Sequence, residues 1–458
     1  MTPREAHAAA GRKKRASRAR CSAPGPVKIT TGSAITAIVE ESRLLPLVDI
    51  QITLRTGSVH DPRGKEGLSR ICAAMIRMGT RRMPARVVEE TIDRLGGHLS
   101  IQCASSFTHF SAVVLERNLD PFMALLGELL RAPAWRAGDL ELVKRETVAE
   151  IIEACDDDHA LSARHFRRYA FGAHPYGRPV SGTPSSVRSI ERGDAIRHWS
   201  RHFVKPNLIV GASGAISAER LGRLVDEHLG GVADGKAPRD RVPATRIMPG
   251  RRVLVVDKPE RTQTQILIGT LGARAGDPDY FALAVGNTVF GGTFTSRLMR
   301  EIRSKRGWSY GASSRIAQDR QRDLWWMWAF PAARDAVPCI RLELSLLEKL
   351  LDRGISENEL RFAKRFLTKS HAFDIDTPVK RLMQSIDVEL FGLPRDFYLR
   401  FVERIQSVTR SEANEALARR LSAKDLAIVL VATADQLKDQ LADLPGVKRV
   451  DTVAFDAE

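Results

Sequence analysis

Two histidines at helical spacing are the first residues in this chain that could hold a metal ion. His198 and His202 are four positions apart, so on a helix their imidazoles share one face. A zinc site needs a third ligand, and a hydrolytic one also needs a carboxylate base, whereas Arg201 stands where that base would be. Of the two interpretations, a partial metal site and a pair of histidines on a helix surface, we favour the second.

Other catalytic motifs are absent from the sequence. It contains no Gly-x-Ser-x-Gly elbow, and the segment Gly291–Ser296 lacks the lysine and the spacing of a phosphate-binding loop. Cys72 has no histidine at a recognisable spacing, so we expect a small buried apolar residue there rather than a nucleophile. The residues therefore provide no self-contained catalytic machinery.

Composition excludes several classes of protein. The 458 residues are 43% hydrophobic and 28% charged, and no apolar run approaches the roughly 18 residues that cross a bilayer. The five cysteines are odd in number and far apart, which excludes a disulfide scaffold and a zinc ribbon. We expect a globular protein of two large or three smaller domains, without a membrane span.

Much of the formal net charge of +16 lies in an N-terminal tail. Residues 1–27 contain seven lysines and arginines against one glutamate, and they lack the apolar segment of a secretory signal. Their composition predicts disorder, and without interleaved aromatic residues we expect a solvating tail rather than a site for phosphate, acidic lipid or nucleic acid. The missing signal predicts a cytoplasmic location, or a periplasmic one if the start is misassigned.

Apolar patterning predicts the elements that position these residues. Strands are expected at residues 48–54, 99–103, 109–115, 208–212, 253–256, 265–268 and 427–431. Helices are expected from about Leu68, after an N-cap at Asp120 followed by Pro121, and over residues 139–155. Capping boxes predict the later helix starts, at Ser356 with Glu359 and at Thr409 with Glu412.

Similar segments recur about 215 residues apart. Residues 51–54 resemble residues 265–268, and Asp61-Pro62 resembles Asp277-Pro278. We favour duplication of one α+β unit over chance similarity. The predicted organisation is a disordered tail at 1–27, an N-terminal domain at 28–229, a linker rich in Gly, Pro and Arg at 230–250, and a C-terminal domain at 251–458.

The segment around the first helix resembles the active-site segment of the pitrilysin/insulinase family. The matching order is strand, turn, Asp61-Pro62, Gly64-Lys65-Glu66-Gly67-Leu68, apolar helix and Gly79-Thr80. This family of inverzincin metallopeptidases includes the mitochondrial processing peptidases. The resemblance covers about residues 30–445 and implies two homologous α+β domains, each an antiparallel sheet packed with helices, that form one half of a clamshell.

The residues that define catalysis in this family are replaced. The family's H-x-x-E-H motif aligns with Arg70-Ile71-Cys72-Ala73-Ala74, so Arg70, Ala73 and Ala74 stand at the two ligand positions and the base position. A protonated guanidinium and two methyl groups cannot bind zinc. Glu150 falls at the third ligand position, and we favour a helix-face acid that pairs with Arg70 over a ligand. We therefore expect no metal in this chain.

A second segment resembles the family more strongly. It runs from Phe290 to Gly311, and Arg303 and Tyr310 occupy the positions of an arginine and a tyrosine that, in the family, reach from the zinc-free half of the clamshell into the zinc-bearing half. There they bind substrate main chain and the developing oxyanion, a role that suits a guanidinium and a phenol. The alternative is a surface arginine and a tyrosine that fills the core.

The resemblance thus implies a catalytically silent subunit of a heterodimeric zinc metallopeptidase. A paralogous partner with H-x-x-E-H would hold the zinc, and this chain would complete a chamber for peptides or unfolded proteins and contribute Arg303 and Tyr310. The chain is not expected to be a peptidase on its own. The alternative is a non-enzymatic scaffold or peptide-binding subunit of a larger assembly.

Overall fold

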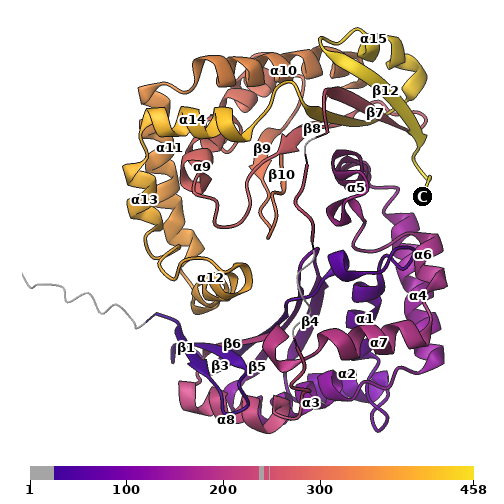
Figure 1. Ribbon diagram of the computed structural model, residues 1–458, viewed down its shortest axis with the longest axis vertical. Helices are drawn as coiled ribbons and strands as arrows, with labels where there is room; N and C mark the ends of the chain where they lie inside the picture. Colours follow the sequence, from indigo (N-terminus) through magenta and orange to yellow (C-terminus); the bar gives the residue numbers. More distant parts are fainter. Residues whose placement is uncertain (1–24, 237–241, 247) are drawn as a thin grey trace, which may run out of the picture.

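The computed structural model of this protein describes residues 25–236, 242–246 and 248–458. The described residues form two lobes, each built on one six-stranded sheet with helices packed against it (Figure 1). The predicted α+β class with two sheet-and-helix units is confirmed, with the refinement that each sheet is mixed rather than purely antiparallel. No helix of the described residues is long and apolar enough to cross a bilayer.

Two predicted segments fall partly outside the described residues. These are residues 1–24 of the predicted tail, and residues 237–241 and 247 of the predicted linker. The domain boundaries therefore stay a prediction, although Val27 already belongs to the first strand.

The first sheet has the strand order β1-β2-β6-β3-β5-β4. Its strands are β1 (Val27–Thr30), β2 (Thr36–Glu41), β3 (Leu47–Leu54), β4 (His98–Cys103), β5 (Thr108–Leu115) and β6 (Leu208–Gly214). β2 and β6 run parallel, and the other neighbours are antiparallel. The four strands predicted in this half are confirmed as β3, β4, β5 and β6, which shows that their apolar patterning was sufficient to locate them.

Helices of the first half follow and separate these strands. They are α1 (Leu68–Arg77), α2 (Ala85–Arg94), α3 (Leu119–Arg131), α4 (Ala137–Glu153), α5 (Asp158–Phe171), α6 (Pro184–Ser189), α7 (Arg192–His202) and α8 (Ala218–Leu229), with short 3-10 turns at η1 (Ser58–His60), η2 (Glu116–Asn118), η3 (Pro175–Gly177) and η4 (Lys205–Asn207). The helices predicted from Leu68 and over 139–155 are confirmed as α1 and α4, within two residues at each end of α4.

The second sheet has the order β12-β7-β11-β8-β10-β9. Its strands are β7 (Arg251–Asp257), β8 (Gln265–Leu271), β9 (Ala312–Ile316), β10 (Leu324–Ala329), β11 (Leu426–Ala432) and β12 (Val447–Ala454). β7 runs parallel to both β11 and β12, and the other pairs are antiparallel. The three strands predicted here are confirmed as β7, β8 and β11.

Helices of the second half include a rare π-helical turn, η5 (Met299–Ser304). The others are α9 (Tyr280–Phe290), η6 (Ala333–Asp335), α10 (Ala336–Arg353), α11 (Glu357–Ser370), η7 (His371–Asp374), α12 (Pro378–Phe391), α13 (Phe401–Ser407), α14 (Arg410–Arg420), η8 (Ala434–Gln436) and α15 (Lys438–Ala442). Both predicted capping boxes are present, at the starts of α11 and α14. In each, a hydroxyl and a glutamate satisfy the helix-end N–H groups.

The two sheets share one topology over five strands. Reading across each sheet, β2-β6-β3-β5-β4 corresponds to β7-β11-β8-β10-β9, with the same parallel pair at one end. The sixth strands differ, because β1 precedes its neighbour in the chain and is antiparallel to it, whereas β12 is parallel to β7. This common order supports the duplicated unit expected from the repeated segments.

The start of α3 differs from the prediction. Asn118 is the N-cap and Leu119 the first helical residue, so Asp120 and Pro121 lie within the first turn. Proline is tolerated there because the first N–H groups of a helix have no acceptor within it. Asp120 instead pairs with Arg220 of α8 at 2.6 Å, and this hydrogen bond lowers the pKa of Asp120.

Helix α5 of the first half packs on the sheet of the second half. Leu161 and Phe166 are buried in one cluster with side chains of β8 and β11. Gly269 in β8 allows this approach, since a Cβ there would lie 2.8 Å from the Phe166 ring. Lys258, just after β7, pairs with Asp158 at the start of α5 at 2.7 Å. The first half thus contributes part of the second half's core.

Helix α12 of the second half makes the reciprocal contact with the first sheet. Its Leu382, Ile386 and Leu390 form a buried cluster with Ile38 of β2 and Ile209 of β6. Burying each such side chain stabilises a fold by about 1.5–3 kcal/mol. Figure 1 shows α12 lying beside β1 and β6, far along the chain from both.

An ion pair fixes α12 on the sheet. Arg381 lies 2.7 Å from Glu40 of β2, whose side chain is fully buried. A charge in such a position is tolerated only when paired. Each half therefore places one helix on the sheet of the other half: α5 packs on the second sheet, and α12 packs on the first. We call this arrangement the exchange of α5 and α12.

The α12 contact predicts the effect of a change in the strand beneath it. A Cβ at Gly211 of β6 would lie 2.8 Å from Ile386 and 3.1 Å from Leu382, so we expect Gly211→Val to lower the free energy of unfolding by about 1–3 kcal/mol. Chemical denaturation of the whole chain measures this. Gly222→Ala in α8 is the control, since its nearest neighbour would be 3.7 Å away. An unchanged free energy of unfolding for the Gly211→Val variant would contradict the packing of α12 on β6.

A buried acid in α10 predicts a pH dependence of stability. Glu343 is 0% exposed, its carboxylate oxygens have no hydrogen-bond partner among the described residues, and burial raises its pKa to about 8. The folded chain keeps a proton there that the unfolded chain releases above about pH 4.5. The free energy of unfolding should therefore fall by up to about 1.4 kcal/mol per pH unit between about pH 5 and pH 8.

Replacing this carboxyl group by an amide tests the prediction. Glu343→Gln removes the ionisation, so its free energy of unfolding should fall less over the same pH range than that of the unaltered chain. Urea unfolding at several pH values measures the difference, and Glu357→Gln is the control because that side chain is exposed. Parallel pH profiles for the Glu343→Gln and unaltered chains would contradict the assignment.

Candidate functional site

A buried aspartate anchors the start of α1, the helix that carries the degenerate motif. Asp61 accepts hydrogen bonds from the backbone N–H groups of Gly67 (2.9 Å) and Ser69 (2.8 Å) and from the Ser69 hydroxyl (2.6 Å). Burial raises the pKa of Asp61 to about 7, although these hydrogen bonds oppose the rise. Gly67 has a φ of 96°, which favours glycine, and its missing Cβ leaves room for the Ser181 carbonyl.

Arg70 of α1 and Glu150 of α4 form an ion pair. The two helices pack against each other, and the pair lies at the surface, with more than half of the Glu150 side chain exposed. The structure thus brings together two of the predicted positions, in the arrangement favoured from the sequence. Ala73 is buried and Ala74 is half-buried on the same helix.

The residues around this pair do not fit a zinc ion. Arg70 stays protonated and would repel a dication, and the methyl groups of Ala73 and Ala74 have no donor atoms. Glu150 alone offers a ligand, whereas zinc sites use three or four. Within the described ranges, no group of three or more His, Cys, Asp or Glu side chains is arranged to hold a metal ion.

The His198 and His202 side chains do not lie on a helix surface, so that prediction is wrong. Both imidazoles are buried, and their centroids are 4.5 Å apart on α7. His198 contacts the Ser69 hydroxyl at 3.0 Å, and His202 contacts the Thr56 hydroxyl at 3.0 Å. Burial lowers the pKa of His198 to about 4 and that of His202 to about 2, so both are neutral near pH 7. They join α7 to α1 through a buried polar network.

Cys72 of α1 is buried, as predicted. Its thiol donates a weak hydrogen bond to the Ala195 carbonyl at 3.6 Å. Burial raises the pKa of Cys72 well above its usual value, so the thiolate needed for nucleophilic attack does not form near neutral pH.

Arg303 and Tyr310 lie together on the surface of the second half. The Arg303 guanidinium carbon is 4.6 Å from the centroid of the Tyr310 ring and 4.5 Å from that of Phe294. Both rings are largely exposed, at 76% for Tyr310 and 72% for Phe294. The alternative of a core-filling Tyr310 is therefore wrong, and the pair forms an aromatic clamp, defined here as Phe294, Arg303 and Tyr310.

The chain around the clamp fixes its geometry. Arg303 lies in the π-helical turn η5, and such turns are frequent at functional sites. Arg297, just before this turn, pairs with Glu359 of α11 at 2.8 Å. On the other side of the clamp, the buried Ser309 hydroxyl accepts from the Phe330 N–H at 3.1 Å. The backbone on both sides of the aromatic clamp is therefore held in place by these interactions.

The Arg303 guanidinium has no carboxylate partner among the described residues. The nearby Glu301 is occupied by Lys305 at 2.8 Å and Arg306 at 3.1 Å. Contact with two ring faces stabilises a cation and leaves the N–H edge of the guanidinium free to donate. The clamp can therefore present up to five N–H donors and a phenol to a carbonyl oxygen or an oxyanion.

Strand β4 lies at the edge of the first sheet. It pairs with β5, and no other strand of the described residues pairs with it. Gly97 directly precedes β4. A Cβ at this position would lie 2.4 Å from the Phe122 ring, which explains why the turn has a glycine there. This edge can accept an extended peptide as an additional strand.

His174 has the structural role expected for it. Its Nδ1 accepts from the Tyr176 N–H at 3.1 Å, and its Nε2 lies 2.8 Å from the Pro243 carbonyl oxygen. These bonds fix the loop after α5, so this histidine has no free nitrogen for chemistry.

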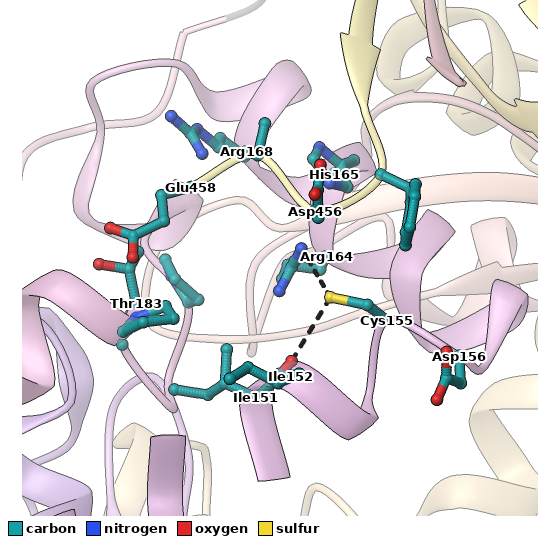
Figure 2. A pocket seen from close by; sticks show the side chains of 15 residues that line it. Ile151, Ile152, Cys155, Asp156, Arg164, His165, Arg168, Thr183, Asp456 and Glu458 are labelled. Atoms are coloured by element: carbon teal, nitrogen blue, oxygen red, sulfur yellow. Dashed lines mark hydrogen bonds between the residues drawn. The ribbon is translucent and has the colours of Figure 1, made fainter. Parts of the chain in front are cut away.

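A hollow of about 310 Å³ lies between α4, α5 and the C-terminal segment (Figure 2). The Cys155 thiol in its wall contacts Arg164 at 3.7 Å and the Ile151 carbonyl at 3.5 Å. Within the part of the chain that the structure describes, no imidazole is hydrogen-bonded to this thiol, and the Glu458 carboxylate in the wall accepts from the Ser185 N–H at 3.0 Å. The hollow therefore contains no nucleophile and base in contact.

Two features of this surface were missed by the sequence reasoning. Phe294 was considered only as part of a glycine-rich segment, although its position two residues after Gly291-Gly292 indicates an aromatic residue in a loop. Trp326 and Trp328 alternate along β10 and are only half-buried. Tryptophans two residues apart in a strand share one face, which was a readable signal.

Two protein-family models match the chain. The model described as Insulinase (Peptidase family M16) matches residues 37–184, and the model described as Peptidase M16 inactive domain matches residues 189–367. Together they cover well over half of the sequence and include α1, α4 and the aromatic clamp.

Full-length relatives are similar to this chain at low identity. A protein named non-peptidase homolog YmxG from Helicobacter pylori is 22% identical over 87% of this chain and 92% of its own length. A protein named uncharacterized zinc protease Mb2805c from Mycobacterium bovis is 26% identical over 86% of this chain and 90% of its own length.

A solved structure shares the fold. The structure described as a peptidase M16 inactive domain from Pseudomonas fluorescens has a TM-score of 0.82 at 21% identity, covering 94% of this chain and 99% of that one. The fold of both halves in one chain is therefore shared with that protein.

The degenerate motif predicts that zinc binding can be restored. Because Glu150 reaches the side chain at position 70, the combined change Arg70→His, Ala73→Glu and Ala74→His places two imidazoles beside this carboxylate. We expect about one zinc per chain after dialysis, against none for the unaltered chain, as measured by elemental analysis.

The carboxylate provides the control for this experiment. Adding Glu150→Gln to the triple variant should reduce retained zinc strongly, because a neutral amide oxygen is a much weaker zinc ligand than a carboxylate. Stoichiometric zinc on the unaltered chain would show that the metal binds elsewhere and would contradict the assignment.

Proposed function

We propose that this chain, which belongs to the M16 (insulinase) family of peptidases but lacks the H-x-x-E-H motif, is the non-catalytic subunit of a heterodimeric zinc metallopeptidase. A paralogous partner with an intact H-x-x-E-H motif supplies the metal and the base. This chain completes the peptide chamber and contributes Arg303 and Tyr310 to the partner's active site.

The observation that carries this proposal is the aromatic clamp. The Arg303 guanidinium carbon lies 4.5 and 4.6 Å from the centroids of two exposed rings, and Arg303 has no carboxylate partner among the described residues. A merely structural arginine would usually be paired or would lie along the surface. An arginine that is held in place with its donors free is preorganised for an incoming acceptor.

The donors suit the transition state of peptide hydrolysis. When the scissile carbonyl is attacked, negative charge develops on its oxygen, and the Arg303 N–H groups and the Tyr310 hydroxyl can donate to it. The loss of one such donor commonly raises the barrier by about 2.7–4 kcal/mol. Phe294 acts through Arg303 and is a positioning residue.

The substrate is a peptide or an unfolded protein in extended conformation. The open edge of β4 offers main-chain hydrogen bonds that do not depend on sequence. Such an edge favours extended chains over folded domains, whose backbone groups are already paired.

A non-enzymatic scaffold or peptide-binding subunit is the second candidate. The relative named a non-peptidase homolog favours it, and the same β4 edge could bind peptide without turnover. This candidate requires no effect of Arg303 or Tyr310 on catalysis by any partner.

The experiment is peptide hydrolysis by this chain, by an H-x-x-E-H partner and by their mixture. We expect activity from the mixture well above that of either chain alone. In the mixture, Arg303→Ala should lower kcat/KM by about 100- to 1000-fold, the usual cost of losing an oxyanion donor. Tyr310→Phe should lower it by about tenfold, the cost of one hydrogen bond to a charged group.

Two further variants separate the clamp from general surface effects. Phe294→Ala should lower kcat/KM by only about two- to tenfold, because it removes one cation–π contact. Arg300→Ala, an exposed arginine in the same turn, should leave the rate unchanged. If the Arg303 and Tyr310 variants leave the activity of the mixture unchanged, this mechanism is contradicted and the scaffold function is favoured. Chelator-sensitive activity of this chain alone would contradict both candidate functions.

A further inference from the structure

A second hollow, of about 260 Å³, lies between α5 and the sheet formed by β8, β10 and β9. Its floor includes the half-buried indoles of Trp326 and Trp328, and Phe166 of α5 closes one side. Arg167 and His159 of α5 and Arg315 of β9 also line it. We define these six residues as the indole hollow.

The strand register places the floor and one arginine on the same face. Trp326 is opposite Arg315 across β10 and β9, and Trp328 is opposite Ser313. Directly opposed residues in an antiparallel pair project to the same side of the sheet. Arg315 therefore stands at the rim of the apolar floor.

The floor is held in place before any ligand binds. The indole N–H of Trp328 donates to the Gln265 side chain at 2.9 Å. Phe330 stacks on Trp328 with centroids 5.0 Å apart, and His159 meets its edge at 5.6 Å. An apolar surface that is already rigid loses little conformational entropy when it binds.

The charge of the hollow is positive. Arg315 is exposed and has no ion pair or hydrogen bond among the described residues. Arg167 pairs with Asp323 through Nη1 at 3.0 Å, but its Nη2 is buried without a hydrogen-bond partner there. No Asp or Glu belongs to the described lining. A ligand with an apolar group and a carboxylate could pack its apolar group on the indoles and pair its carboxylate with Arg315.

We propose that the indole hollow is a specificity subsite for an aromatic side chain flanked by an acidic residue in a bound peptide. The aromatic ring would lie on the indoles, and the neighbouring carboxylate would accept from the exposed Arg315. The assignment of this peptide as substrate rests on the proposed function, whereas its binding does not.

The subsite is close to the aromatic clamp along the chain. Ser313 follows Tyr310 by three residues, which in extended backbone corresponds to about 10 Å. Gly311 lies between them against the Trp328 and Phe330 rings, where a Cβ would be 3.2 Å from Trp328. The aromatic clamp and the indole hollow are therefore separated by at most about 10 Å of chain.

Direct titration of the full chain with short peptides tests the proposal. The probe is an acetylated, amidated peptide with the core Glu-Phe-Glu, and the comparison peptides have the cores Gln-Phe-Gln, Glu-Ala-Glu and Lys-Phe-Lys. Calorimetry should show the Glu-Phe-Glu peptide binding at least tenfold more tightly than each of the others. Binding should also weaken as salt is raised, because Arg315 is exposed.

Variants locate the binding. Arg315→Gln should weaken binding of the Glu-Phe-Glu peptide about tenfold and leave the Gln-Phe-Gln peptide unchanged, and Trp328→Ala should weaken both. Arg334→Gln, an exposed arginine beyond the end of β10, is the matched control and should change neither. Because Arg315 is exposed, its variant should fold even if the Trp328 variant does not.

The outcomes separate this proposal from the proposed function. Equal affinity for the Glu-Phe-Glu and Gln-Phe-Gln peptides, or no effect of Arg315→Gln, would overturn the subsite. Selective binding that Arg315→Gln removes would establish it, even if the clamp variants leave a partner's turnover unchanged and so contradict the proposed function.

Discussion

The reciprocal exchange of α5 and α12 is the contact on which the rest of this structure depends. Each half places one helix on the sheet of the other, and the apolar clusters around Phe166 and Ile386 bury faces that neither half covers alone. The ion pairs of Glu40 with Arg381 and Asp158 with Lys258 fix the same contacts. The edge strand, the indole hollow and the aromatic clamp therefore belong to one packed unit.

The α1–α4 region shows how the fold persists without zinc ligands. The exposed pair of Arg70 and Glu150 contributes only about 0–1 kcal/mol, so it cannot be what holds the two helices together. Buried side chains such as Ile71, Met75 and Ile151 provide the contact instead. The helix pair is thus stabilised by its apolar core, which leaves the surface positions free to change.

Much of the framework could be predicted because it follows from local pattern. Alternating apolar residues located β3 and β5, and the capping boxes located α11 and α14. The helix exchange could not be predicted, since an apolar helix face does not specify which sheet it will cover. The same limit explains the error at His198, because burial of a polar side chain depends on partners such as Ser69 that are distant in sequence.

The sequence predicted which residues belong to the candidate site better than it predicted their contacts. Motif spacing identified Arg303, Tyr310, Arg70 and Glu150, and the structure places them in two separate pairs. Their roles remain predictions. Phe294 was missed because its contact with Arg303 depends on how a glycine-rich loop returns toward the π-helical turn. The path of such a loop is determined by tertiary packing rather than by local propensity.

The exchange also bears on how the chain folds while it is being made. The sheet face around Ile38 and Ile209 is complete once β6 has left the ribosome, yet its cover, α12, is still far from synthesis. At about 5–20 residues per second, synthesis from the end of β6 to the start of α12 takes roughly 8 to 33 seconds, and that face is uncovered during this time. Transiently exposed apolar surface promotes aggregation, so the nascent first half is most prone to aggregate in the interval before α12 is made.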